Sequence, residues 1–267
     1  MKNLLLALTL STFATGSWAA CPYNLDATEL EIQQSNPSAT PPLKKFPVFL
    51  GSTGSFTLQA PSFQYHAMSK KLATAMPTAF TSMTIAGDKI ISNTGIYAIE
   101  LKINDFANIP LGTHTSTSSG VTTLGYNFYA MKNNAIVMAG FVWIMNSDDT
   151  KKKQVVVDYV DLSSGTSTGK QYDIPYSSPN NYKIGVYFDQ NAKKMGVNLN
   201  GVNQGYISNT SYSIAPTELS IDLMGLSGGY PTSLPSTFHP SMTLITDAQQ
   251  MSLTYPSGSK DICGNIL

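Results

Sequence analysis

The sequence has 267 residues, of which 42% are hydrophobic, and its 16 basic and 16 acidic residues balance to a formal net charge of zero. All 16 basic residues are Lys, so the chain lacks the Arg side chains that commonly bind phosphate, and strong nucleic-acid binding is excluded. The apolar fraction is too high for a disordered chain, and the length suffices for one large core.

The N-terminal stretch from Met1 to Ala19 predicts a cleaved secretory signal. Lys2 gives a basic start, an apolar run covers Leu4 to Leu10, and small residues end the stretch. The run is too short to span a membrane, and no later segment approaches the roughly 20 apolar residues that a helical span needs. We therefore expect an exported protein without a transmembrane segment, located in the periplasm, on the outer surface or outside the cell.

Cys21 and Cys263 are the only two cysteines. An oxidising compartment favours a disulfide between them, which would join the two ends of the mature chain. The alternative is a lipidated N-terminal Cys21, which would leave Cys263 as an odd thiol. Trp18 lies where a lipidation motif requires Leu, so we expect the disulfide.

Residues 20–55 predict an extended N-terminal lead-in, because prolines recur between Pro22 and Pro47. Apolar residues then recur at helical spacing between Met68 and Met76 and stop at Pro77. This pattern predicts one short surface helix and no other.

The remaining residues, within 56–267, show short stretches in which apolar and polar side chains alternate, as in half-buried strands. The clearest stretch is 182–207, where Asn200-Gly201 supplies a hairpin turn. Further strands are expected at 56–64, 80–86, 89–92, 96–103, 124–131, 135–145, 154–161, 219–224, 241–246 and 252–255, with polar loops at 113–123 and 163–169. The pattern predicts one all-β domain at 56–267, a two-sheet antiparallel β-sandwich with at most one short helix.

Two phrases in the hairpin region carry a resemblance to a known fold. Asn181–Asp189 (NYKIGVYFD) and Gly196–Gly201 (GVNLNG) resemble the strand, loop, strand and Asn-Gly pattern of concanavalin A-like jelly rolls of the laminin G and SPRY kinds. The resemblance implies a curved sandwich whose concave face or rim loops bind glycans or proteins. The chain also resembles bacterial exported proteins of unknown function, a likeness that implies no activity.

The strand expected at 135–145 is apolar on both faces, so it is either covered on both sides or lines a groove. Its outward side carries Trp143. By parity, the outward sides of other strands carry Asn127, Tyr129, Asp158, Tyr187 and Asn198, with Gly185 and Gly196 leaving space above the sheet. An aromatic ring beside hydrogen-bonding side chains commonly meets a sugar, so these six residues form the predicted ligand-binding site. The alternative is that loops such as Thr113–Thr123 bury Trp143.

The sequence gives less support to a catalytic function. The segment Lys183–Tyr187 is similar to part of a strand motif of jelly-roll alginate lyases, which implies a proton-abstracting Tyr, but the Arg and the Gln-His pair of those enzymes are missing. A glycosidase needs two nearby carboxylates, and the one close Glu pair, Glu29 and Glu31, precedes the strand-rich part. Gly225–Gly229 spells G-x-S-x-G, but the prolines that follow forbid the required helix, so we expect a glycine turn.

Metal sites are weakly indicated. His66, His114 and His239 are widely separated, which does not favour zinc. Asn146 with Asp148-Asp149 lies at an expected hairpin tip, where oxygen ligands could hold Ca²⁺, although a solvated turn explains them equally. We expect no required cofactor.

These observations predict an exported, non-enzymatic binding protein that recognises glycans on the concave sheet face. The first alternative is a structural or adhesive protein that pairs with another cell-envelope chain. The second is a polysaccharide lyase or glycoside hydrolase that uses Tyr187 and Asp158. Lysine pairs such as Lys193-Lys194 would favour anionic glycans if they gathered at one rim.

Overall fold

A computed structural model describes residues 20–57, 63–82, 84–106, 114–115, 118–119, 121–147, 152–175, 179–228 and 239–267. The predicted secretory signal at 1–19 and the acidic pair of the predicted calcium site, Asp148-Asp149, lie outside these residues. Among the described helices, none has the length and apolar character that a membrane crossing requires.

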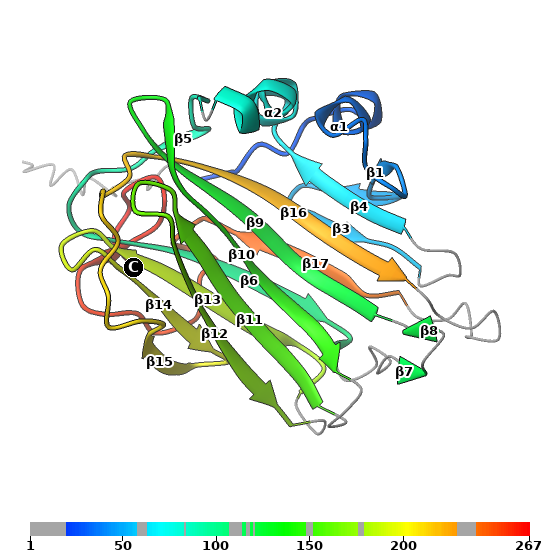
Figure 1. Ribbon diagram of the computed structural model, residues 1–267. Coiled ribbons are helices and arrows are strands. Elements are labelled where there is room, and N and C mark those ends of the chain that lie inside the picture. The colour runs from blue at the N-terminus through cyan, green and yellow to red at the C-terminus, as the bar shows by residue number, and fades with distance from the viewer. Residues whose placement is uncertain are drawn as a thin grey trace, which may run out of the picture.

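The described strands form two stacked sheets, called sheet A and sheet B (Figure 1). Sheet A has the order β1 (Leu43–Lys45), β4 (Phe63–Met68), β16 (Glu218–Gly228), β9 (Val121–Lys132), β10 (Ala135–Ser147), β11 (Lys152–Asp161), β12 (Thr166–Ile174), and β5 (Lys89–Ile90) pairs with β16. Sheet B has the order β15 (Val202–Tyr206), β14 (Lys194–Leu199), β13 (Tyr182–Asp189), β6 (Ile96–Asn104), β17 (Ser241–Ile245), β3 (Thr53–Ser55), β2 (Val48–Leu50), and β18 (Ser259–Lys260) pairs with β6. A small hairpin joins β7 (His114–Thr115) to β8 (Ser118–Ser119). The predicted two-sheet antiparallel β-sandwich is confirmed, except that β1 pairs with β4 and β18 with β6 in parallel.

The core lies between the two sheets, because alternate residues of each strand point inward. Tyr126 and Phe128 of β9 are fully buried from sheet A, and Val186 and Phe188 of β13 are buried from sheet B. The rings of Phe128 and Phe188 meet edge to face with centroids 5.3 Å apart. Period-two alternation in the sequence therefore identified the inward faces correctly.

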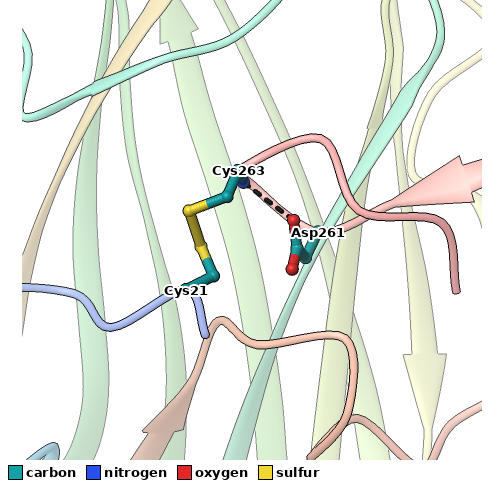
Figure 2. A group of neighbouring side chains, drawn as sticks. All are labelled: Cys21, Asp261 and Cys263. Carbon is teal, nitrogen blue, oxygen red and sulfur yellow. Dashed lines mark hydrogen bonds between the residues drawn. A yellow bond between two sulfur atoms is a disulfide. The ribbon is translucent and has the colours of Figure 1, made fainter. Parts of the chain in front are cut away.

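The predicted disulfide between Cys21 and Cys263 is confirmed (Figure 2). Asp261 holds the segment around it, because its carboxylate accepts hydrogen bonds from the backbone N–H of Cys263 (2.9 Å) and of Ala248 (3.1 Å). The Thr246 hydroxyl donates to the carbonyl of Cys21 at 2.6 Å. With its sulfur in a disulfide, Cys21 is not the lipid-bearing residue of the alternative. Such a bond is typical of compartments outside the cytoplasm.

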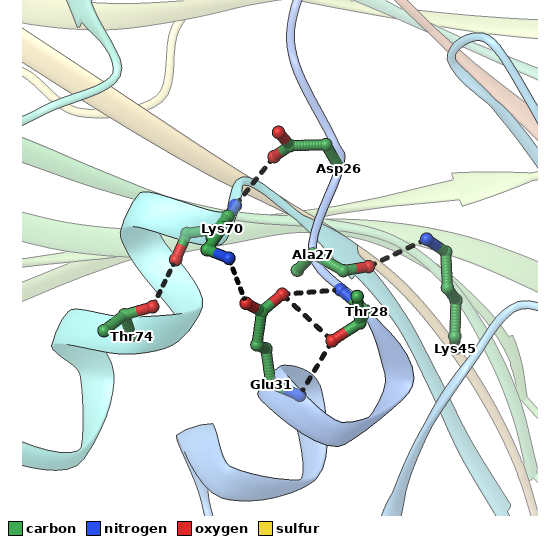
Figure 3. A network of polar contacts seen from close by, with 7 residues as sticks. All are labelled: Asp26, Ala27, Thr28, Glu31, Lys45, Lys70 and Thr74. Carbon is green, nitrogen blue, oxygen red and sulfur yellow. Dashed lines mark hydrogen bonds and ion pairs between the residues drawn. The ribbon is translucent and has the colours of Figure 1, made fainter.

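The expectation that residues 20–55 are extended is wrong in part, because α1 spans Glu29–Ser35. Thr28 and Glu31 form a capping box: the Thr28 side chain accepts from Glu31 N–H, and the Glu31 carboxylate accepts from Thr28 N–H at 2.8 Å. Glu31 also pairs with Lys70 at 2.8 Å, which connects α1 to α2 (Figure 3). Glu31 therefore caps the helix, and Glu29 lies in its first turn.

The second helix, α2 (Lys70–Ser82), continues through Pro77 instead of ending there. It replaces the start of the strand expected at 80–86, and the described part of the chain has two helices where one was expected. Three other local predictions are also wrong: β12 occupies most of the loop expected at 163–169, Gly225–Gly228 lie within β16 instead of a turn, and 252–255 form no strand.

Helices α1 and α2 lie side by side at one end of the molecule (Figure 1). They pack on the outer face of sheet A through a second apolar cluster that includes Ile32, Leu72, Met68, Tyr129 and Met131. This cluster covers one end of that face, and the rest of the face positions the candidate site.

Candidate functional site

The outer face of sheet A brings together side chains from five neighbouring strands. Directly paired residues run across it as Asp222 (β16), Asn127 (β9), Phe141 (β10), Asp158 (β11) and Gly169 (β12). The next row of the same face holds His66, Met224, Gly125, Trp143 and Val156. The two rows share a face because residues two apart in a strand point the same way.

Phe141 and Trp143 form an aromatic pair at the centre of this face. Their rings are stacked, with centroids 3.7 Å apart and planes inclined by 19°. Both side chains are half-buried, so part of each ring remains exposed. Trp143 lies against Gly125 on the neighbouring strand, where a Cβ atom would come within 2.8 Å of the indole Cδ1. The same Cβ atom would overlap the backbone oxygen of Val142, so glycine at position 125 makes room for the backbone of β10 as well as for the indole.

A chain of hydrogen bonds leads from the aromatic pair across three strands, and we call it the polar chain. The Trp143 indole Nε1–H donates to Asn127 Oδ1 at 3.2 Å, and Asn127 Nδ2–H donates to Asp222 Oδ2 at 3.0 Å. His66 Nδ1 contacts both carboxylate oxygens of Asp222, at 3.0 and 2.9 Å. An ionised carboxylate only accepts hydrogen bonds, so His66 Nδ1 carries the proton in this contact.

The inner end of the polar chain is buried. His66 is 6% exposed and Asp222 is 2% exposed, and His66 Nε2 has no hydrogen-bond partner. A buried polar atom without a partner costs about 1–3 kcal/mol. Among the described residues, His66 Nε2 shares this state with Glu100 Oε2 and the hydroxyls of Tyr126 and Tyr172. The neighbouring Tyr129 is buried under the helices, and burial, helped by the Asp222 charge, raises the pKa of its phenol.

Asp158 lies on the other side of the aromatic pair and is half-buried. Burial raises the pKa of its carboxyl group, while a 3.4 Å hydrogen bond from Ser167 Oγ acts in the opposite direction. Its carboxylate extends over Gly169, where a Cβ atom would overlap Oδ2. This acid therefore flanks the exposed aromatic rings without an ion-pair partner among the described residues.

The six sequence-predicted site residues do not share one face. Asn127, Trp143 and Asp158 lie together on the outer face of sheet A, and Tyr129 lies on the same face beneath the helices. Tyr187 and Asn198 belong to sheet B, whose outer face points away from sheet A. The alternation of side chains along each strand correctly predicted which of them point outward, but it could not predict to which sheet each strand belongs.

A segment that we call the C-terminal roof, residues 247–258, covers the outer face of sheet B. Glu100 anchors it by accepting from Ser252 N–H (2.9 Å), Leu253 N–H (2.8 Å) and the Tyr255 hydroxyl (3.2 Å). Asn198 donates to the carbonyl of Thr254 at 2.8 Å.

The space that was expected above Gly185 and Gly196 is filled. A Cβ atom at Gly185 would overlap the Tyr255 hydroxyl, and one at Gly196 would overlap the Tyr187 ring. Tyr187 itself is 3% exposed and packs against Tyr206 and Tyr255. On this face, the aromatic and amide side chains hold a segment of the chain itself.

Three residues of the candidate site were missed from the sequence as site members: His66, Asp222 and Phe141. Asp222 alternates with buried residues in β16, which signals an outward acid, and Phe141 is on the same side of β10 as Trp143. His66 and Asp222 are 156 residues apart, and only the pairing of β4 with β16 brings them together.

The carboxylates of this face are not arranged as a glycosidase pair. Asp222 and Asp158 stand three strands apart, which separates their backbones by about 14 Å at the usual strand spacing. The two carboxyl groups of glycosidases are about 5–9.5 Å apart. The geometry of this pair therefore gives the hydrolase alternative no support.

A cluster of possible metal ligands and the two acids of one surface hollow already have partners within the protein. Within the described part of the chain, Cys21, Asp261 and Cys263 place three possible ligand atoms within 4.8 Å of one another, but the two sulfurs form the disulfide. A hollow of about 700 Å³ beside the start of α2 includes Asp26 and Asp88 in its lining. Asp26 accepts from Lys70 N–H, and Asp88 accepts from Tyr23 and Ser69 hydroxyls.

Residues 4–265 match a family profile described as a domain of unknown function, DUF4882. The chain belongs to this family. The family description names no activity, and no curated protein matches the chain.

Solved structures with a similar fold include proteins of several kinds. A legume lectin-like domain from Entamoeba histolytica is 12% identical, with a TM-score of 0.42, over 75% of this chain and 87% of that one. The CBM2 module of the evolved Dit of Lactobacillus casei BL23 phage J-1 is 10% identical, with a TM-score of 0.43, over 84% and 86% of the two chains. The PL7 alginate lyase AlyA1 from Zobellia galactanivorans is 10% identical, with a TM-score of 0.36, over 68% and 74%. Identities and scores this low say nothing about what the present chain binds.

Proposed function

We propose that this protein is an exported binding protein that holds a glycan against the outer face of sheet A. The observation that carries the proposal is the stacked, half-buried pair Phe141 and Trp143, flanked by the Asn127 amide and the Asp158 carboxylate. Aromatic rings meet the apolar C–H face of a sugar, and amide and carboxylate groups bind its hydroxyls. On the outer face of sheet B, by contrast, Tyr187 and Asn198 are buried against the C-terminal roof.

The charges on the face favour an uncharged glycan or one that carries amino groups. Asp158 and Asp222 lie on either side of the aromatic pair. Lys45, which pairs with His66 on this face, uses its ammonium group to bind the carbonyl of Ala27 at 2.7 Å. Asp222 is buried against His66, so a uronate or sulfated sugar would meet a charge of its own sign at the half-buried Asp158. The lysine pairs Lys70-Lys71 and Lys193-Lys194 lie on α2 and at the β13–β14 turn, away from the pair.

Trp143 provides the test of this proposal. A chain that carries Trp18→Phe retains Trp143 as its sole tryptophan, so a change in its emission reports binding at the aromatic pair. We expect neutral or amino oligosaccharides to change the emission and uronate oligosaccharides to leave it unchanged.

Calorimetry then compares Trp143→Ala with Tyr206→Ala, an exposed aromatic at the edge of sheet B. Trp143→Ala should weaken binding at least about fivefold, since stacking contributes on the order of 1 kcal/mol or more, and Tyr206→Ala should not. Silence of the wild-type protein on an array of neutral, amino and acidic glycans would refute the proposal.

A further inference from the structure

We propose that Asp222 and His66 are positioning residues that set the orientation of the Trp143 indole through the Asn127 amide. The ligand half of this inference depends on the proposed glycan-binding function, whereas the orientation of the indole can be tested without any ligand. Neither residue is exposed enough to meet a ligand itself, at 2% and 6% exposure.

The direction of each hydrogen bond follows from the carboxylate of Asp222. Because a carboxylate has no proton to donate, Asn127 must turn its NH₂ group toward Asp222 at 3.0 Å. Its carbonyl oxygen is then directed at Trp143, where it accepts from the indole Nε1–H at 3.2 Å. The Asp222 carboxylate thus determines the orientation of the Asn127 amide, and the amide determines the direction of the Trp143 indole N–H.

This orientation determines how Trp143 can meet a ligand. The indole has a single hydrogen-bond donor, and Asn127 uses it. The exposed part of the side chain is therefore available for contact through its ring, next to the stacked ring of Phe141. A sugar would be recognised there by its C–H face, and its hydroxyl groups would bind to other side chains.

His66 is the last residue of the polar chain, at the end away from Trp143. Its Nδ1–H holds both oxygens of Asp222, which leaves Nε2 as a buried nitrogen without a partner. Holding Asp222 in the orientation that Asn127 requires gives the imidazole a role that an apolar residue of similar size could not fill.

Glu100 supplies a matched control for Asp222. It is also a buried carboxylate on an outward face, at 0% exposure, and it also accepts several hydrogen bonds. Its partners belong to the roof over sheet B and are unconnected to Trp143. If neutralising any buried carboxylate disturbed the fold, the indole of Trp143 would be affected by substitution of either Asp222 or Glu100. If Asp222 positions the indole, only substitution of Asp222 should affect it.

The experiment uses the full chain with Trp18→Phe and follows the indole N–H resonance of Trp143 and its hydrogen exchange. Asp222→Asn should move the resonance and speed its exchange, because the new amide can donate and lets Asn127 turn over. Binding of a neutral oligosaccharide identified with the wild type should weaken about tenfold. Glu100→Gln should leave the resonance, its exchange and the affinity as in the wild type.

The double variant Asp222→Asn with Asn127→Asp provides a rescue that a merely structural role would not predict. The exchanged side chains can rebuild the polar chain from His66 to Trp143: residue 222 accepts from His66 through its one oxygen and donates to residue 127, which accepts from Trp143. Only the second of the two His66 contacts is lost. We expect the indole resonance to return toward its wild-type position.

An unchanged resonance in Asp222→Asn, or no return in the double variant, would overturn the positioning role. If Asp222→Asn does not fold, the double variant decides alone. If no glycan binds the wild type, the proposed function fails, but the resonance still decides the positioning role.

Discussion

The outer faces of the two sheets carry similar aromatic and polar residues, but these residues have different roles on each face. On sheet A, Phe141 and Trp143 stay half-exposed above a hydrogen-bonded amide. On sheet B, Tyr187 and Asn198 are buried, at 3% and 0% exposure, under the C-terminal roof. The comparison teaches that alternation tells which side of a strand a residue occupies, but whether that side is open depends on segments far away in the chain.

A buried carboxylate marks the difference between the two faces. Glu100 binds backbone N–H groups of residues 252 and 253, so it holds a separate segment down onto sheet B. Asp222 binds side chains of two neighbouring strands of its own sheet, so it fixes the surface and covers nothing. The first arrangement closes a face, and the second organises one that remains open.

Removal of the disulfide should have the largest effect on this contrast. The double variant Cys21→Ala with Cys263→Ala removes the covalent link between Cys21 and the segment that follows the roof. We expect the free energy of unfolding to fall by about 2–5 kcal/mol. Urea denaturation measures the loss. Trp143 emission in the folded state should not change, because the disulfide lies apart from the aromatic pair; a shifted folded-state emission would show that the two faces are coupled.

A pair of glycine variants tests the contrast at two matched positions. A Cβ atom at Gly185 would overlap the Tyr255 hydroxyl and come within 2.8 Å of Leu253 Cδ1, and both side chains belong to the C-terminal roof. Gly185→Ala should therefore cost about 1–3 kcal/mol of unfolding free energy, as overpacking does. A Cβ atom at Gly169 would overlap a carboxylate oxygen of Asp158, which is half-buried and can rotate away.

Gly169→Ala should consequently change stability by no more than about 0.5 kcal/mol, while displacing Asp158 and weakening glycan binding. Thermal or urea unfolding and calorimetric titration of both variants make the comparison. Equal losses of stability at the two positions would contradict the distinction between a covered face and an open one.

The sequence predicted the sandwich because its apolar residues alternate, and this pattern survives in the buried strands. It did not predict β12, since the side chains of Thr166 to Gln171 are exposed or only half-buried at the edge of sheet A and no alternation is required there. The capping box of Thr28 and Glu31 was present in the sequence, but the surrounding prolines favoured an extended interpretation. Strands that bury one face could thus be predicted from the sequence, whereas a strand at an exposed sheet edge could not.

The candidate site was predictable only in part for the same reason. Trp143, Asn127 and Asp158 lie on strands that follow one another or pair locally, so parity placed them together. His66 and Asp222 meet through strands 156 residues apart, and no local pattern encodes that register. The roof over Tyr187 is a segment without regular strands, held by contacts to Glu100 and Asn198 that only the folded chain reveals.

The smallest expected effect concerns the helices that cover one end of sheet A. Hydrogen bonds from Lys70 and then from Thr28 lower the pKa of Glu31 to about 2 from an ordinary 4.5. A carboxylate whose pKa is lower in the folded state stabilises the fold above its unfolded value, and this stabilisation is lost as the pH falls from about 4.5 toward about 2.

Glu31→Gln should therefore be slightly less stable than the wild type at about pH 6, and the difference should shrink at about pH 3. Urea unfolding at both pH values measures this, and Lys70→Gln, which removes the largest cause of the shift, should reproduce the same narrowing. A difference that stayed constant with pH would mean that the α1–α2 ion pair does not hold the helices over sheet A. Because Glu31 is exposed and screened by solvent, loss of this pair should loosen α1 while leaving the indole of Trp143 where the polar chain holds it.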